Sequence, residues 1–182
     1  MCIRDRFKAW RKGNVGILNA IGTGVADDKV VYSYVNKMIV YYLGEQPILN
    51  QVETYLCHDK IQMDYVIDNI SKLVVKPANA SGGYGIMIGP KAPQKEREEV
   101  IAKIKKNPRE FIAQPLEILS TAPTITKNDI EPRHLDLRPF VLSGKSTYVT
   151  TGGLTRVALR KGSTIVNSSQ GGGSKDTLIV DI

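Results

Sequence analysis

The sequence predicts an α+β fold with two β-rich lobes, flanking helices and an antiparallel sheet in the C-terminal half. In residues 1–110, several segments repeat apolar residues every three or four positions, as amphipathic helices do. After residue 110, short apolar runs alternate with glycine-containing turns, which is typical of antiparallel strands. With 182 residues, of which 42% are hydrophobic, the chain can form one core or two small lobes.

The first 110 residues are expected to combine helices with short strands. Residues 1–12 are interpreted as an incomplete or non-native segment that contains a stretch of helix interior, and residues 13–110 as a helical linker plus a small lobe. The elements expected here are a helix at Phe7–Lys12, a strand at Val15–Ala20, a helix from about Val25 to Leu43 ended by Gly44, a strand at Gln51–Leu56, a helix at Asp59–Ile70, strands on both sides of Ser81–Gly85, and a helix at Gln94–Lys106. The expected core contacts of the last two helices are Ile61, Tyr65, Ile67 and Ile70, and Val100, Ile101 and Ile104.

Residues 111–182 are expected to form the larger lobe, and the chain to be a fragment that leaves this lobe incomplete. A strand should end at Pro115, since proline cannot donate to a strand ladder, and Ser120–Pro132 should be a polar loop. The strands expected beyond it are His134–Leu142, Thr147–Thr151, Leu154–Leu159, Ser163–Asn167 and Thr177–Asp181, with turns at Ser143–Lys145, Gly152–Gly153 and Lys161–Gly162 and a glycine loop at Ser168–Asp176.

Charge and cysteine content narrow the function classes. The 25 Lys+Arg against 18 Asp+Glu give a net charge of +7, which favours anionic ligands such as nucleotide phosphates or nucleic acid. The basic residues do not alternate with aromatic ones, which argues against nucleic-acid binding. Two cysteines and two separated histidines suggest neither a disulfide framework nor a Cys/His metal site, so a reduced, cytoplasmic protein is expected. No apolar run has the roughly 20 residues of a membrane helix.

The segment Leu73–Gly89 brings a lysine next to a glycine-rich turn. Lys76 ends an apolar run, and the turn SGGYG leads into a second one. Glycines allow a backbone to approach a phosphate closely, so this segment could be a nucleotide-phosphate site or an ordinary β-hairpin. Other phosphate motifs are weak or missing: GTGVAD lacks the third glycine of a dinucleotide fingerprint, GGGSKDT is not a Walker A loop, and the kinase signatures do not occur.

The strand HLDLR places polar and apolar residues on opposite faces. His134, Asp136 and Arg138 share one face because strand side chains alternate. These residues could either face a cleft or form a structural ion pair. The face that Arg156 occupies depends on whether a bulge interrupts its strand, and the sequence leaves this open.

Five blocks resemble, in order, a known family: VVKPANASGGYGIMIGP, FIAQPLEILSTAPT, PRHLDLRPFVLSG, GGLTRVALRKGS and NSSQGGGSKDT. They are similar to the circularly permuted type 2 ATP-grasp proteins, which are related to glutathione synthetase and glutathionylspermidine synthase. The resemblance runs from about residue 13 to 180. It implies ATP-dependent ligation of a small-molecule or peptide carboxylate to an amine through an acyl-phosphate, with Mg²⁺ on the phosphates.

The resemblance also implies roles for individual residues. Lys76 and Lys29 would contact the ATP phosphates, where a compact ammonium acts as a point charge. Two flexible loops would close over the phosphates: Ser81, Gly82, Gly83, Tyr84 and Gly85 form the first, and Gln170, Gly171, Gly172 and Gly173 form the second. The hinge that reads the adenine would be Gln114, Pro115 and Leu116. Arg156 and Arg138 would be catalytic, and Asp136 would bind metal.

Two departures from the family pattern concern the metal. The Glu-x-Asn strand that holds metal in the family is expected upstream of this segment because of the permutation, and nothing before Gly13 supplies it. Ala80 occupies a position where relatives can carry a glutamate ligand. The alternative to a ligase is therefore a non-catalytic nucleotide-binding or interaction module, with a basic RNA-binding domain as a third possibility.

Overall fold

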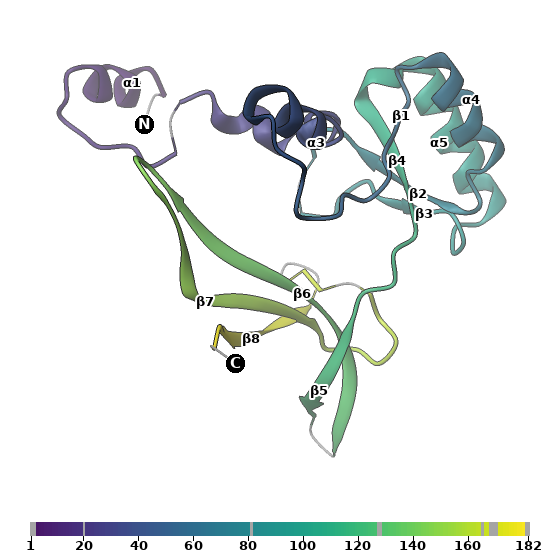
Figure 1. The fold of residues 1–182 in the computed structure, drawn as a ribbon. Coiled ribbons are helices and arrows are strands. Elements are labelled where there is room, and N and C mark those ends of the chain that lie inside the picture. The colour runs from purple at the N-terminus through teal and green to yellow at the C-terminus, as the bar shows by residue number, and fades with distance from the viewer. Residues whose placement is uncertain are drawn as a thin grey trace. The chain divides into compact units, whose positions relative to one another are not determined.

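Two four-stranded antiparallel sheets organise the part of the chain that the structure describes (Figure 1). This computed structural model describes residues 3–19, 21–80, 82–126, 129–164, 166–167 and 171–180. Unit 1 comprises residues 1–80 and 85–115, and unit 2 comprises residues 81–84 and 116–182. The combination of two sheets with helices confirms the predicted α+β class.

The helical part of unit 1 is more broken than predicted. It contains α1 (Ile3–Arg11), the 3₁₀ turn η1 (Thr23–Asp27), α2 (Lys29–Tyr32), α3 (Val35–Met38) and the π-helical turn η2 (Ile39–Leu43). The single helix expected from Val25 to Leu43 is interrupted because Asp28 has an extended backbone. Its carboxylate instead accepts a hydrogen bond from the Val30 amide at 2.8 Å and starts a new helix. Gly44 ends the last turn in the left-handed conformation, as predicted.

The predicted strand at Val15–Ala20 is wrong over its described residues. Residues 15–19 are exposed, Leu18 to 96%, and Asn19 has a positive φ of 64°. None of the described strands pairs with this run. An apolar segment forms a strand only where a neighbouring strand accepts its backbone hydrogen bonds.

The sheet of unit 1 has the order β1–β4–β2–β3 and is antiparallel throughout. Its strands are β1 (Tyr55–Leu56), β2 (Leu73–Pro77), β3 (Met87–Ile88) and β4 (Phe111–Pro115). The strand β4 pairs with β1 and β2, whereas the predicted lobe boundary at residue 110 assigned it to the second lobe. Pairing of distant segments decides this, and local sequence does not show it.

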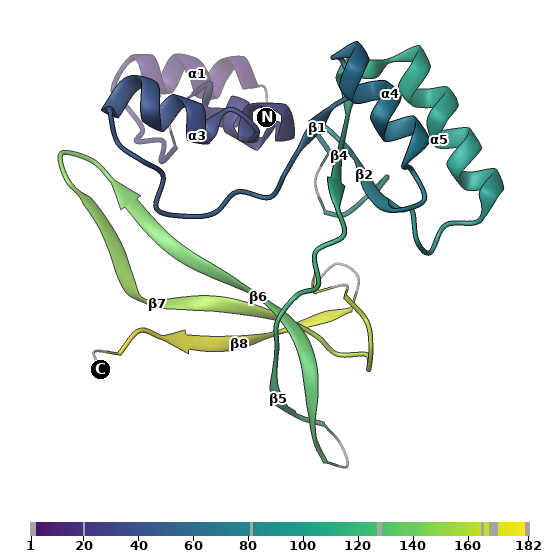
Figure 2. The ribbon, with the colours of Figure 1, turned by 45° about the vertical axis from the view of Figure 1, so that its right-hand side comes forward.

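Two helices cover one face of this sheet, α4 (Lys60–Asp68) and α5 (Gln94–Lys106) (Figures 1 and 2). The short 3₁₀ turn η3 (Pro108–Glu110) leads from α5 into β4. The core on this face consists of Cys57, Val66, Ile70, Leu73, Val75, Met87, Ala92, Ile104 and Ala113. Ile70 and Ile104 were predicted core residues, but Ile61 and Tyr65 are exposed, because α4 turns Val66 toward the sheet instead.

The opposite face of the same sheet is apolar at one end and polar beyond it. Val30 of α2 packs there against Leu56, Ala78 and Ile112. Since side chains alternate along a strand, Lys76 in β2 and Gln114 in β4 lie on this face too, away from α4 and α5. The packing of α2 therefore leaves a polar area beside a buried apolar one.

The sheet of unit 2 has the order β5–β6–β7–β8. Its strands are β5 (Thr121–Ile125), β6 (Ile130–Ser143), β7 (Thr147–Ala158) and β8 (Gly172–Leu178). The predicted antiparallel C-terminal sheet is confirmed, but several of its predicted local features are wrong. Most of the expected loop Ser120–Pro132 lies in β5 and β6, residues 163–164 and 166–167 are not strand, and Gly172 and Gly173 lie in β8.

The pair Gly152–Gly153 was expected to be a turn but lies inside β7. Gly153 faces Pro139 of β6, beside an irregularity in the register between Pro139 and Val141. A Cβ atom on Gly153 would lie 2.9 Å from the carbonyl oxygen of Arg138. The close approach of the two strands therefore explains why a glycine is found at this position. In the sequence alone, the same Gly-Gly pair resembles a turn.

We expect Gly153→Ala to lower the free energy of unfolding of unit 2 by about 1–3 kcal/mol, because the added methyl group forces the strands apart. Urea unfolding monitored by circular dichroism measures the change. Gly144→Ala is the control, since a Cβ there has its nearest neighbour, the Ser146 carbonyl oxygen, at 4.0 Å. Equal stabilities of the two variants would contradict this explanation of Gly153.

In the part of the chain that the structure describes, no helix combines the length and the hydropathy needed to cross a bilayer.

Candidate functional site

Lys76 and Lys29 form a pair of neighbouring ammonium groups in unit 1. Lys76 lies near the end of β2, and Lys29 is the first residue of α2. The Lys29 backbone amide donates to the Ala78 carbonyl at 2.8 Å, and its Nζ donates to the Ala80 carbonyl at 2.6 Å. These two bonds attach the start of α2 to the segment that leaves β2, so both predicted phosphate-contacting lysines lie in one region.

Lys76 belongs to a chain of side-chain hydrogen bonds. Its Nζ donates to Oε1 of Gln114 at 2.6 Å, and Nε2 of Gln114 donates to Oγ1 of Thr54 at 2.8 Å. The hydroxyl of Thr54 donates to the Val52 carbonyl at 3.0 Å. Sequence reasoning missed Thr54, because only the strand register shows that it approaches Gln114.

The electrostatics of the lysine pair suit an anion. Burial lowers the pKa of Lys76 below its ordinary value, and the positive charge of Lys29 lowers it further. Burial also lowers the pKa of Lys29, and Asp28 opposes that shift. Among the described residues, neither ammonium has a carboxylate within ion-pair distance.

Asp28 is the carboxylate closest in sequence to this pair, and it has partners of its own. One oxygen caps α2 and the other accepts from Arg109 Nη2 at 2.7 Å. The Arg109 hydrogen bond is the main cause that holds the pKa of Asp28 below its ordinary value. Asp28 thus stays ionised and bound to Arg109, which the sequence did not single out.

The glycine loop after β2 has left-handed backbone at several positions. Gly82, Gly83 and Gly85 have φ of 70°, 79° and 72°. A Cβ atom on Gly85 would lie 2.9 Å from Cγ of Pro77. Tyr84 is exposed, and Ser81 lies outside the described residues. The strands β2 and β3 on either side do pair as a hairpin, so the hairpin alternative is correct in geometry and does not exclude a phosphate site beside Lys76.

The predicted adenine hinge lies where the chain passes from unit 1 to unit 2. Gln114 and Pro115 end β4 and belong to unit 1, and Leu116 is the first residue of the second stretch of unit 2. The buried side chain of Gln114 is directed to Lys76, so any hinge role falls to backbone groups.

Unit 2 brings Asp136 and Arg156 together as cross-strand partners in β6 and β7. Arg156 Nε donates to the two Asp136 oxygens at 2.8 and 3.1 Å, its Nη2 contacts Asp136, and its Nη1 donates to Asn167. The strand is regular here, so Arg156 shares a face with Leu154 and Ala158, which decides the open question about its orientation. Asp136 does form an ion pair, but its partner is Arg156 and not Arg138, the partner expected from the sequence.

The two other polar residues of this strand face differ from each other. His134 contacts the Leu119 carbonyl through Nδ1 at 2.7 Å, whereas Arg138 is exposed and makes no ion pair with any described residue. The hydrogen bonds of Arg156 lower the pKa of Asp136, and Asp136 raises the pKa of Arg156.

The described residues do not fit the predicted metal site at Asp136. Both carboxylate oxygens accept hydrogen bonds from Arg156, a cation that competes with a metal ion. No group of three or more His, Cys, Asp or Glu side chains among the described residues could hold a metal ion. Mg²⁺ requires several oxygen ligands, so Asp136 in this arrangement does not supply a site for it.

The second predicted glycine loop is only partly a loop. Gln170 lies outside the described residues, and Gly171 has a positive φ of 83°. Gly172 and Gly173 pair with Ala158 and Val157 in the sheet. Of the predicted loop residues that the structure describes, Gly171 alone keeps a turn conformation.

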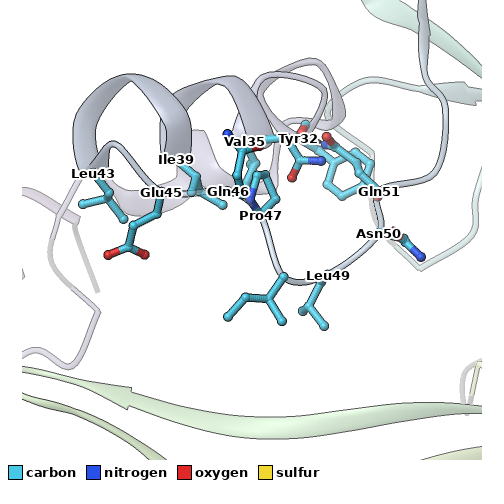
Figure 3. Close-up of a pocket in the computed structure, with 12 residues that line it drawn as sticks. Tyr32, Val35, Ile39, Leu43, Glu45, Gln46, Pro47, Leu49, Asn50 and Gln51 are labelled. Carbon is cyan, nitrogen blue, oxygen red and sulfur yellow. Dashed lines mark hydrogen bonds between the residues drawn. The ribbon is translucent and has the colours of Figure 1, made fainter.

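Unit 1 also contains an apolar pocket of about 450 Å³ that involves none of the predicted site residues (Figure 3). Helical side chains that include Val35 and Ile39 line it on one side, and the loop from Glu45 to Gln51 lines it on the other. Gln51 holds this loop through a bond to the Tyr32 carbonyl. The lining has no lysine or arginine, so the pocket lacks the charge that a phosphate requires.

We expect Asp136→Asn to lower the free energy of unfolding by about 1 kcal/mol at pH 7, as for a partly buried ion pair. The pKa of Asp136 is lower in the folded state than its ordinary value of 3.8, so the ionised carboxylate stabilises the fold fully at pH values above 3.8. That stabilisation is lost as the pH falls through the folded-state pKa. Thermal unfolding from pH 7 to pH 2 should therefore show the two proteins converging in acid.

The control is Asp64→Asn, which removes an exposed pair with Lys60 and should change stability little at any pH. A difference between wild type and Asp136→Asn that stays constant down to pH 2 would contradict the prediction.

A family model described as circularly permuted ATP-grasp type 2 matches residues 3–158. The chain belongs to this family. The ATP-grasp resemblance and fold predicted from the five sequence blocks are thereby confirmed, although the match ends before the second glycine loop.

Relatives of this ATP-grasp chain are longer than it is. An uncharacterised Synechocystis protein is 55% identical over 175 residues, which cover 96% of this chain and 36% of that protein. An uncharacterised Mycobacterium tuberculosis protein is 53% identical over 173 residues, covering 94% of this chain and 31% of that protein. A Frankia casuarinae protein, provisionally named a glutamate–cysteine ligase, is 53% identical over 173 residues, covering 95% of this chain and 20% of that protein.

Proposed function

We propose that this chain is the ATP-binding portion of a carboxylate–amine ligase, with Lys76 and Lys29 as the contacts to the ATP phosphates. The observation that carries the proposal is the lysine pair: two partly buried ammonium groups with no carboxylate in ion-pair distance among the described residues. A polyanion would compensate both charges at once. Lysine suits this role because its ammonium is a compact point charge.

The reaction would proceed in two steps. The γ-phosphoryl group of ATP would pass to a carboxylate, giving an acyl-phosphate and ADP, and an amine would then attack the acyl carbon and release phosphate. Stabilising charge on the transferring phosphoryl group is the contribution expected of lysine and arginine side chains. The name of the Frankia relative, a provisional glutamate–cysteine ligase, supports an amino-acid carboxylate and an amine as the substrate class.

Two arginines of unit 2, Arg156 and Arg138, are candidates to hold the substrate carboxylate. Arg156 is hydrogen-bonded to Asp136 and Asn167, whereas Arg138, two residues after Asp136 on the same face of β6, is exposed. Arg138 is therefore the better candidate to hold a substrate carboxylate, and Arg156 would have to exchange Asp136 for substrate. The described His, Cys, Asp and Glu residues include no group of three or more that would hold the Mg²⁺ that accompanies ATP in the family.

Protection from amine modification tests the ATP site directly. The lowered pKa of Lys76 leaves part of its side chain as the neutral amine that an acylating reagent attacks. Mg-ATP should slow that reaction, as read by peptide mass spectrometry. Unchanged modification of Lys76 and Lys29 at saturating Mg-ATP would refute the site.

One observation favours a second function. Ala80 contributes only its backbone carbonyl, which accepts from Lys29, at a position where the family resemblance implies that a metal-binding glutamate can occur. The chain could then be a nucleotide-binding module without catalysis. ADP release with glutamate and candidate amines discriminates: tight ATP binding without amine-dependent ADP release would favour the module.

A further inference from the structure

The hydrogen bonds that surround Lys76 run in one direction. The Thr54 hydroxyl gives its single proton to the Val52 carbonyl, so its oxygen is left to accept from Gln114. The NH₂ group of Gln114 must therefore face Thr54, and its carbonyl oxygen must face Lys76. The opposite orientation of the amide would put two donors, NH₂ and NH₃⁺, against each other.

The acceptor that holds Lys76 is buried and uncharged. Gln114 is only 7% exposed, so its amide has little access to water as an alternative partner. A carboxylate in the same place would hold the ammonium equally well in geometry, but it would also cancel its charge. Lys29 is the charged group that acts on Lys76, and because it is a cation it does not cancel the charge of Lys76.

We propose that Thr54 and Gln114 form a positioning relay that fixes the Lys76 ammonium in place and leaves its charge available to a polyanionic ligand. The two hydrogen bonds of the relay fix the position of the Lys76 ammonium. Because its acceptor is an amide and not a carboxylate, the positive charge of Lys76 is not neutralised. The role of the ligand rests on the proposed ATP site, whereas the effect of the relay on Lys76 does not.

The first experiment needs no nucleotide. The Cε chemical shift of Lys76 in the ¹³C-lysine-labelled chain follows its titration, and Lys76→Arg assigns the signal. Gln114→Glu should raise the pKa of Lys76 by at least ~1 unit, because an opposite charge favours the ammonium form. Thr54→Val should lower it, because the released amide no longer presents a fixed acceptor, and Thr54→Ser should restore it. Shifts in opposite directions are not expected from a purely structural role.

The second experiment measures ATP binding by calorimetry at fixed ionic strength. Gln114→Glu should weaken binding by ~10-fold or more, because the added negative charge offsets the Lys76 ammonium and repels the phosphates. The matched control is Gln94→Glu, the same substitution at an exposed position of α5, where Gln94 bonds Glu98. That variant should bind ATP like the wild type, apart from the small effect of one remote charge.

The outcomes separate the relay from the ATP site. The proposal fails if the Lys76 pKa does not rise in Gln114→Glu and fall in Thr54→Val, or if the wild-type chain binds ATP and Gln114→Glu binds it as tightly as Gln94→Glu does. If the wild-type chain binds no ATP while the Lys76 pKa responds as expected, the relay is supported and the ATP site is refuted. Circular dichroism of each variant verifies that the comparison is between folded proteins.

Discussion

Replacing Lys76 with alanine should weaken ATP binding by the chain on the order of 10- to 100-fold, the range expected for losing a hydrogen bond from a charged group. The substitution removes one of two adjacent cations and also leaves the buried Oε1 of Gln114 without its donor. Lys29 alone would then face the phosphates. Isothermal titration calorimetry with Mg-ATP at fixed ionic strength measures the change.

Lys72→Ala is the control for this experiment, because Lys72 is exposed just before the same strand and its loss changes the net charge equally. Its effect on ATP affinity should be small. Equal affinities of the Lys76→Ala and wild-type chains would show that the phosphate site lies elsewhere.

Ile104→Ala should lower the free energy of unfolding by about 2–5 kcal/mol, the range for removing a large buried aliphatic side chain. Ile104 is 0% exposed and belongs to the core cluster in which α4 and α5 meet the first sheet. Its truncation leaves a cavity between close-packed elements, and the surrounding structure can fill that cavity only in part.

The matched control is Ile61→Ala on α4, where the same atoms are removed from a side chain that is 82% exposed. That change should stay within about 0.5 kcal/mol. Urea unfolding of both variants gives the comparison, and similar losses would mean that Ile104 is not in the core as the structure places it.

Where a local signal specifies an element, the sequence predicted it well. The apolar run expected to form a strand before Ser81–Gly85 is β2, and the periodic segment Gln94–Lys106 is α5. The helix expected at Asp59–Ile70 forms after Asp59, whose carboxylate accepts from the Gln62 amide as an N-cap. Periodicity, caps and prolines act on neighbouring residues, which explains why these predictions succeeded.

Failures occurred where a distant segment decides the conformation. The run Val15–Ala20 has strand composition but no partner strand among the described residues. Gly153 has turn composition but lies in a strand, because Arg138, distant in sequence, approaches it closely. In both cases the local pattern is compatible with two structures, and only long-range pairing chooses between them.

By itself, the sequence determined the fold class, the family and the two lysines of the candidate site. Tertiary structure decided what each polar side chain contacts: Gln114 holds Lys76, Arg156 rather than Arg138 pairs with Asp136, and Thr54 takes part. The physical reason is that motifs and periodicity are written into consecutive residues. Contacts between side chains depend instead on strand register, which the packing of the whole unit selects.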